Sequence, residues 1–191
     1  FVGEFLSGLH QVCEESSVIL IFDEVITGFR VAYGGGQELF EISPDLATYG
    51  KALGGGAPIG AVAGREDIMQ CFNWNSDRTT APKIFTGGTF GGNPLSMVAG
   101  RAQVEYLRDN QEIYETLAYH GQRVSDEIGV FADNKGLPIK VTTANSMIRL
   151  HFDDNESFTV PGVDGPSLTV EKEFYLRLAL DGILIPGDHL A

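Results

Sequence analysis

The feature that most constrains this chain is a run of five apolar residues that ends abruptly at two carboxylates. Residues 18–22 read Val-Ile-Leu-Ile-Phe, and Asp23 and Glu24 follow directly. A short continuous apolar run of this composition is typical of a parallel-sheet strand that is buried on both faces. Ligands of open α/β sheets bind outside the carboxyl ends of such strands, so the residues after the run are candidate site residues.

Apolar spacing and turn residues predict the other elements. Asn93 and Pro94 suit the N-cap and first turn of a helix that continues to about Arg108. The other expected helices cover residues 5–15, 65–72, 112–128 and 170–180. The other expected strands cover residues 45–49, 61–63, 138–142, 146–152 and 182–186.

Two domains are predicted, with a boundary near residue 110. Strands and helices alternate over residues 1–110, which is typical of a layered α/β domain with a parallel sheet. The later hairpin and helices, residues 111–191, indicate the beginning of a second, smaller α/β domain.

Composition and charge narrow the class of protein. The chain has 26 acidic and 13 basic side chains, and a formal charge of −13 opposes attraction to nucleic-acid phosphates. No run approaches the roughly 20 apolar residues that cross a membrane, and no signal-peptide pattern opens the chain, so we expect a cytoplasmic protein. Cys13, Cys71 and the four histidines show no metal-ligand spacing, so no metal site is expected.

Asp23 and Lys51 allow both an ordinary and a functional interpretation on the residues alone. A carboxylate at the end of a buried strand requires a partner, because an unpaired buried charge is costly. In the ordinary interpretation, Asp23 caps a loop or pairs with Arg30, and Lys51 is a solvated loop lysine. In the functional interpretation, Asp23 binds a ligand cation and Lys51 is a reactive amine. The glycine-rich surroundings of Lys51 do not fit a phosphate-binding Walker A loop, because Ala52 stands where Ser or Thr is needed.

Three motifs, in the same order along the chain, resemble those of class-III aminotransferases. Residues 20–30, Leu-Ile-Phe-Asp-Glu-Val-Ile-Thr-Gly-Phe-Arg, resemble the strand of that family that faces the cofactor. Residues 44–56, Pro-Asp-Leu-Ala-Thr-Tyr-Gly-Lys-Ala-Leu-Gly-Gly-Gly, resemble its lysine motif, and residues 88–94, Gly-Thr-Phe-Gly-Gly-Asn-Pro, its phosphate segment. Glutamate-1-semialdehyde aminomutases belong to the same group. The resemblance implies the aspartate-aminotransferase-like fold, called fold type I.

The resemblance also implies a cofactor, pyridoxal 5'-phosphate, and a role for each matching residue. Lys51 is expected to form a Schiff base with the cofactor, and Asp23 to face the pyridine nitrogen. Val25 is expected to pack on the cofactor ring. The alternative, ordinary packing in the protein core, predicts nearly the same position for this side chain. Gly88 and Thr89 are expected to bind the phosphate, with Thr89 reaching the neighbouring subunit of a homodimer, unless it is a simple loop threonine.

The implied reaction is transfer of an amino group from an amine or amino acid to an oxo acid or aldehyde. The first alternative is an intramolecular transfer on glutamate 1-semialdehyde, and the second is a non-catalytic binding or regulatory protein with the same fold. Residues 73–83 are longer than the corresponding segment of the aminomutases, which counts against the intramolecular alternative, and we expect them to shape the substrate entrance. Because Phe1 stands in place of an initiator Met, we also expect a longer parent protein whose N-terminal half and extreme C-terminus are not in this sequence.

Overall fold

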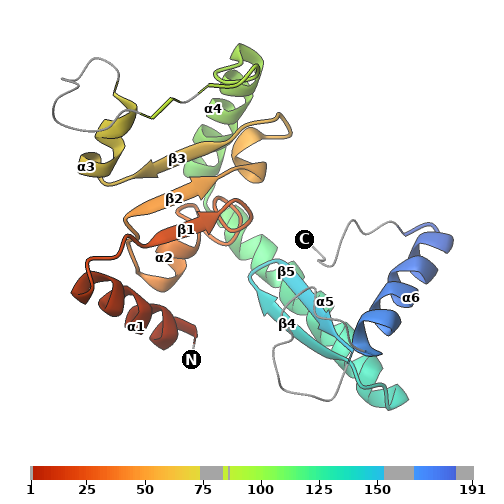
Figure 1. Ribbon diagram of the computed structural model, residues 1–191. Coiled ribbons are helices and arrows are strands. Elements are labelled where there is room, and N and C mark those ends of the chain that lie inside the picture. The colour runs from red at the N-terminus through yellow and green to blue at the C-terminus, as the bar shows by residue number, and fades with distance from the viewer. Residues whose placement is uncertain (1, 74–83, 86, 153–165, 184–191) are drawn as a thin grey trace. The chain divides into compact units, whose positions relative to one another are not determined.

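The computed structural model describes residues 2–73, 84–85, 87–152 and 166–183 (Figure 1). The chain forms two compact units that divide after Ile113. The first contains a three-stranded sheet and the second a two-stranded sheet.

The sheet of the first unit has the strand order β1-β2-β3. β1 (Ile21–Glu24) and β2 (Leu46–Tyr49) are parallel, as predicted, whereas β3 (Ala61–Gly64) pairs antiparallel with β2. A parallel β3 would need a crossover of a dozen or more residues. The connection from Gly50 to Gly60 is shorter, so an antiparallel return is the geometry available to it.

The prediction that residues 18–22 form a strand buried on both faces is wrong in its start and in its burial. β1 begins at Ile21, and Val18, Ile19 and Ile21 are more than half exposed. Within the described residues β1 is an edge strand, so no further strand covers its outer side. Its side chains alternate instead, with Ile21 and Asp23 exposed and Glu24 buried, as expected when one face of a strand packs inward.

Helices flank this sheet. α1 (Val2–Glu15) precedes it, and α2 (Gly36–Phe40) lies in the β1–β2 connection. The 3₁₀ turn η1 (Lys51–Gly54) follows β2, and α3 (Glu66–Met69) with η2 (Gln70–Phe72) follows β3. α4 (Pro94–Asp109) packs against η1 through Gly100, where a Cβ would lie 3.1 Å from the carbonyl oxygen of Leu53.

The start of α4 matches the sequence prediction. The Asn93 side-chain oxygen accepts hydrogen bonds from the backbone N–H groups of Leu95 at 3.0 Å and Ser96 at 3.4 Å, and Pro94 occupies the first turn. These bonds satisfy backbone donors that have no partner within a helix.

The second unit contains α5 (Glu112–Lys135), β4 (Lys140–Ala144), β5 (Met147–His151) and α6 (Pro166–Leu180). The predicted hairpin is present and antiparallel, but α5 ends at Lys135 and not at residue 128. Gly129 does not end the helix, since an interior glycine costs only about 1 kcal/mol. Gly136, with a φ of 61°, follows its last residue, as is typical of a helix C-terminus.

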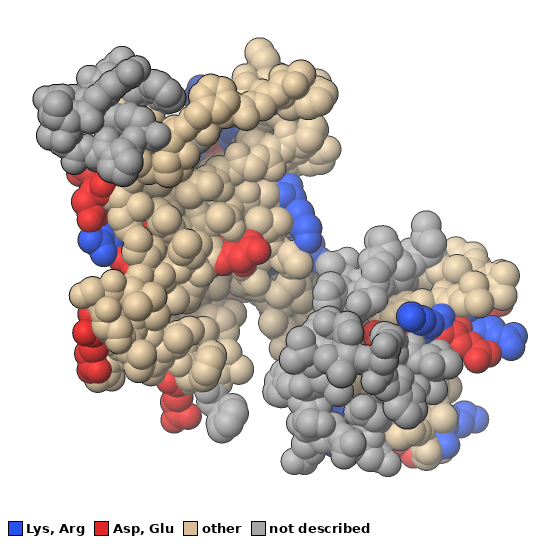
Figure 2. All heavy atoms as spheres, viewed as in Figure 1, with Lys and Arg blue, Asp and Glu red and all other residues tan. Residues whose placement is uncertain are grey.

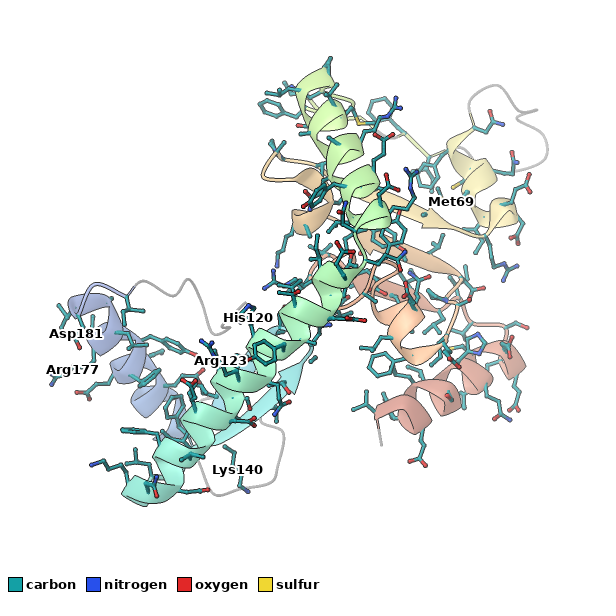
Figure 3. The ribbon with its side chains drawn as sticks, turned by 180° about the vertical axis from the view of Figure 1, so that it is seen from behind. Met69, His120, Arg123, Lys140, Arg177 and Asp181 are labelled. Atoms are coloured by element: carbon teal, nitrogen blue, oxygen red, sulfur yellow. The ribbon has the colours of Figure 1, made fainter. Side chains whose placement is uncertain are left out.

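The hairpin packs closely on α5 at Gly121, where a Cβ would lie 2.3 Å from the carbonyl oxygen of Asn145. Ile148 and Leu150 of β5 are buried. Figure 3 shows His120 and Arg123 on α5, Lys140 at the start of β4, Arg177 in the last turn of α6 and Asp181 directly after it.

The described residues contain no helix long and apolar enough to cross a membrane. Nor do they contain a group of three His, Cys, Asp or Glu side chains able to hold a metal ion. Cys13 and Cys71 are free. The strand expected over 182–186 lies largely outside the described residues, as does the segment 74–83.

Candidate active site

Parallel pairing places the carboxyl ends of β1 and β2 at one edge of the sheet (Figure 1). Asp23 is opposite Thr48 and Glu24 is opposite Tyr49. The sequence motifs that contain Asp23 and Lys51 therefore meet in space at the strand ends, where ligands of α/β sheets bind.

Val25 and Lys51 lie just beyond these ends. A Cβ on Gly50 would be 3.4 Å from Cγ1 of Val25, so this side chain lies against the backbone next to Lys51. Lys51 opens η1 with a φ of 43°, and the N–H of Leu53 donates to the carbonyl of Gly50 at 2.9 Å. A left-handed φ is uncommon for a residue with a side chain, and such residues cluster at functional sites.

Asp23 is exposed and is oriented by neutral donors. Its Oδ1 accepts from the Thr48 hydroxyl at 2.9 Å and from the N–H of Val25 at 3.1 Å. Within the described residues neither Arg30 nor Lys51 forms an ion pair with it, and Oδ2 has no donor. Burial therefore does not require a cation beside Asp23, contrary to the expectation from the sequence, because this side chain is on the exposed face of β1.

The buried carboxylate belongs to Glu24, which is 1% exposed. Its Oε2 accepts from the N–H of Gly36 at 2.9 Å and from the Thr27 hydroxyl, and its Oε1 accepts from the N–H of Gln37 at 2.9 Å. The cost of burying a carboxylate, expected from the sequence for Asp23, applies instead to Glu24. Three hydrogen bonds from neutral donors offset this cost.

Gly88 and Thr89 lie on an exposed turn before α4. The turn is closed by a hydrogen bond from the N–H of Gly91 to the carbonyl of Gly88 at 2.8 Å. α4 contacts η1 farther along its length, near Gly100. The cofactor-binding role of both residues remains a prediction.

A hollow of about 820 Å³ lies at the opposite ends of β1 and β2, away from Asp23 and Lys51. Leu20 and Asp45 line it where the strands begin, together with Arg65. Asp45 Oδ2 accepts from the N–H of Leu20 at 2.7 Å and Oδ1 from Arg65 at 2.6 Å. The Leu20 hydrogen bond, followed by the one from Arg65, lowers the pKa of Asp45. This ion pair joins the strand starts and is not part of the candidate site.

Sequence reasoning missed four residues around the site, namely Glu24, Gln37, Thr48 and Tyr49. Two adjacent carboxylates after an apolar run do not reveal which one is buried, because a shift of one residue exchanges the two faces of a strand. One signal was present in the glycines at 34–36, of which Gly35 and Gly36 allow the backbone to approach Glu24 closely.

The residues present fit a pyridoxal phosphate site. Asp23 keeps one carboxylate oxygen without a donor among the described residues, and the Lys51 side chain is exposed beyond the same strand ends. Val25, directly after β1, provides an apolar side chain that lies against the backbone of Gly50, next to Lys51.

Solved transaminase structures share this fold. An omega-transaminase from Sphaerobacter thermophilus has a TM-score of 0.82 and 31% identity over 98% of this chain and 42% of that chain. A transaminase with PLP bound has a TM-score of 0.80 and 29% identity over 97% of this chain and 41% of that one. The chain therefore has the aspartate-aminotransferase-like fold, fold type I, as the sequence predicted.

The family follows from the sequence match. The pattern of the family Aminotransferase class-III matches residues 2–189, and the chain belongs to this family. A glutamate-1-semialdehyde 2,1-aminomutase from Methanocaldococcus jannaschii is 37% identical over 182 residues, which are 95% of this chain and 41% of that protein. The chain thus spans about two fifths of the length of this relative.

Proposed function

We propose that the whole protein is a pyridoxal-phosphate-dependent aminotransferase that moves an amino group from an amine or amino acid to an oxo acid or aldehyde. The observation that carries this proposal is the meeting of Asp23, Val25 and Lys51 at the ends of two parallel strands, within a match to the family over residues 2–189. A transaminase with PLP bound has the same fold.

Each residue has a separate task in this proposal. Asp23 holds a proton at the pyridine nitrogen through its carboxylate, and Thr48 keeps that carboxylate oriented. Lys51 provides the amine that binds the cofactor and later moves the proton of the substrate Cα, which an arginine is too basic to do. The cofactor, when bound, supplies the electron sink for the carbanion at Cα.

The register supports these tasks. Asp23 is opposite Thr48 within the register, whereas Lys51 lies two residues beyond Tyr49, the last residue of β2. The ring nitrogen and the reacting carbon are at opposite ends of the cofactor ring. Two residues that engage both ends must therefore be separated along the strand direction, as Asp23 and Lys51 are.

We further propose a cytoplasmic homodimer in which Gly88 and Thr89 contribute to phosphate binding, with Thr89 reaching the neighbouring subunit's cofactor. Support comes from the exposed turn that holds both residues, where their polar groups are accessible. The domain assignment is part of this proposal. Residues 1–110 belong to the cofactor-binding large domain, and residues 111–191 begin the small domain.

An intramolecular transfer on glutamate 1-semialdehyde is the second candidate, favoured by the name of the M. jannaschii relative. A non-catalytic binding protein is disfavoured because Asp23 and Lys51 are both present at the strand ends.

The test is an assay of the whole protein for conversion of its cofactor to the pyridoxamine form with a panel of amino donors, including glutamate 1-semialdehyde. Conversion by several donors supports the aminotransferase. Turnover of glutamate 1-semialdehyde alone, with 5-aminolevulinate as product, identifies the aminomutase, and no conversion by any donor contradicts both.

A further inference from the structure

Glu24 is the largest fully buried side chain among the described residues, and the proposed reaction gives it no task. Its carboxylate receives hydrogen bonds from Thr27, Gly36 and Gln37, which all lie in the connection from β1 to α2 or at the start of α2. The N–H of Gly28 also donates to the Glu24 carbonyl at 2.9 Å. The connection after the Asp23 strand is therefore folded around this one residue.

The glycines of the connection are required by this contact. A Cβ on Gly35 would lie 2.6 Å from Oε2 of Glu24, and one on Gly36 would lie 3.2 Å from Oε1. Gly35 also has a φ of 74°, which disfavours other residues. The chain thus approaches the carboxylate more closely than a segment with side chains would allow.

A second set of contacts extends from this carboxylate to the lysine strand. The Gln37 side chain, whose backbone binds Glu24, donates from Nε2 to the Tyr49 hydroxyl at 2.6 Å. Tyr49 is opposite Glu24 in the register and two residues before Lys51, and its ring lies 5.8 Å from that of Phe29. Glu24, Gln37 and Tyr49 therefore connect the ends of β1 and β2.

We propose that Glu24 is a positioning residue that, through Gln37 and Tyr49, fixes the distance between Asp23 and Lys51; this inference rests on the proposed function. The contacts join the residue after Asp23 to the second residue before Lys51, so loosening them lets the two strand ends move apart. Asp23 and Lys51 must engage opposite ends of one rigid ring, and a shift of about 1 Å in a reacting group can cost on the order of a hundredfold in rate.

The test uses the whole protein in four variants. Tyr49→Phe removes only the hydroxyl that Gln37 binds, and Gln37→Leu removes the side-chain donor. Glu24→Gln replaces one of the two acceptor oxygens with an amide group that donates, so one of the two backbone N–H groups loses its acceptor. Gln122→Leu is the matched control, because Gln122 makes an exposed hydrogen bond to Asp126 on α5. The measurements are kcat, KM for the amino donor, and the visible circular dichroism of the bound cofactor, which reports its orientation.

We expect Tyr49→Phe and Gln37→Leu to keep full cofactor content, to change the visible circular dichroism, and to lower kcat by about tenfold or more, with KM within about twofold. Values equal to those of Gln122→Leu would overturn the positioning role. In the unsubstituted protein, fast hydrogen exchange at the Gly36 and Gln37 amides would also overturn it, and this measurement does not require cofactor. A protein with protected amides but no cofactor absorption would instead contradict the proposed function.

Discussion

At the scale of single residues, adjacent carboxylates have opposite surroundings because strand side chains alternate. Asp23 is exposed beside Thr48, and Glu24 is enclosed by the β1–α2 connection. The family resemblance correctly indicated that Asp23 lies at the end of the strand. The burial expected for Asp23 was wrong, because the buried carboxylate is that of Glu24. Local sequence predicts a strand, but which face is covered depends on contacts from distant segments such as Gly36 and Gln37.

Lys51→Ala in the whole protein is expected to abolish covalent fixation of the cofactor by borohydride. The physical reason is that the exposed amine beyond β2 is the group proposed to bind the cofactor. Peptide mapping after reduction should find the cofactor on the peptide that contains Lys51. Recovery of the label on Lys140 of the second unit would contradict the assignment.

Asp23→Asn is expected to keep the fold and part of the cofactor binding while lowering the rate of Cα proton abstraction by several powers of ten. The amide accepts the Thr48 hydrogen bond but does not hold a proton at the pyridine nitrogen. Single-turnover absorbance with a deuterated donor measures this step. Near-normal turnover would show that another group maintains the protonated ring.

At the scale of elements, the most predictable parts depend on neighbouring residues along the chain. The start of α4 was predicted from Asn93 and Pro94, because a cap binds N–H groups two and three residues away. The antiparallel β3 and the exposed edge of β1 were not predicted, because strand order and direction follow from pairings between distant segments. The hydrogen bond from Gln37 to Tyr49 also joins separate segments, so the sequence did not predict it.

Asn93→Ala is expected to lower the free energy of unfolding of the whole protein by about 1 kcal/mol, since two helix N–H groups lose their acceptor. Asn93→Ser should retain most of the stability, because a serine hydroxyl caps a helix nearly as well. Urea unfolding curves of both variants provide the measurement. Equal losses for alanine and serine would show that the cap contributes little.

The ion pair at the strand starts predicts a pH dependence. The pKa of Asp45 is lowered from 3.8 by the Leu20 N–H and then by Arg65, so its contribution to stability is complete above pH 3.8. That contribution is lost as the pH falls through the lower folded-state pKa. Asp45→Asn should therefore reduce stability at neutral pH and flatten the loss of stability below pH 3.8. Parallel acid-unfolding curves for both proteins would contradict this.

At the scale of the whole molecule, the described surface of the first unit contains several exposed large apolar side chains. Val18, Ile19 and Ile21 flank the edge strand, and Phe5 and Val12 project from α1, all more than half exposed. Figure 2 shows few charged side chains over the middle of this unit. Hydrophobic strand edges without a partner favour association.

The 191-residue chain expressed alone is therefore expected neither to hold pyridoxal phosphate specifically nor to transaminate. It presents Asp23, Val25 and Lys51, which form one side of a site, and it spans 41% of the M. jannaschii relative. Binding in a concave site normally buries most of a ligand's surface, and three residues at the ends of two strands supply only part of such a site. Absorbance titration with the cofactor and analytical ultracentrifugation, each repeated on Lys51→Ala, would measure binding and association. A soluble monomer with a stoichiometric visible cofactor band that disappears in Lys51→Ala would show that these residues suffice.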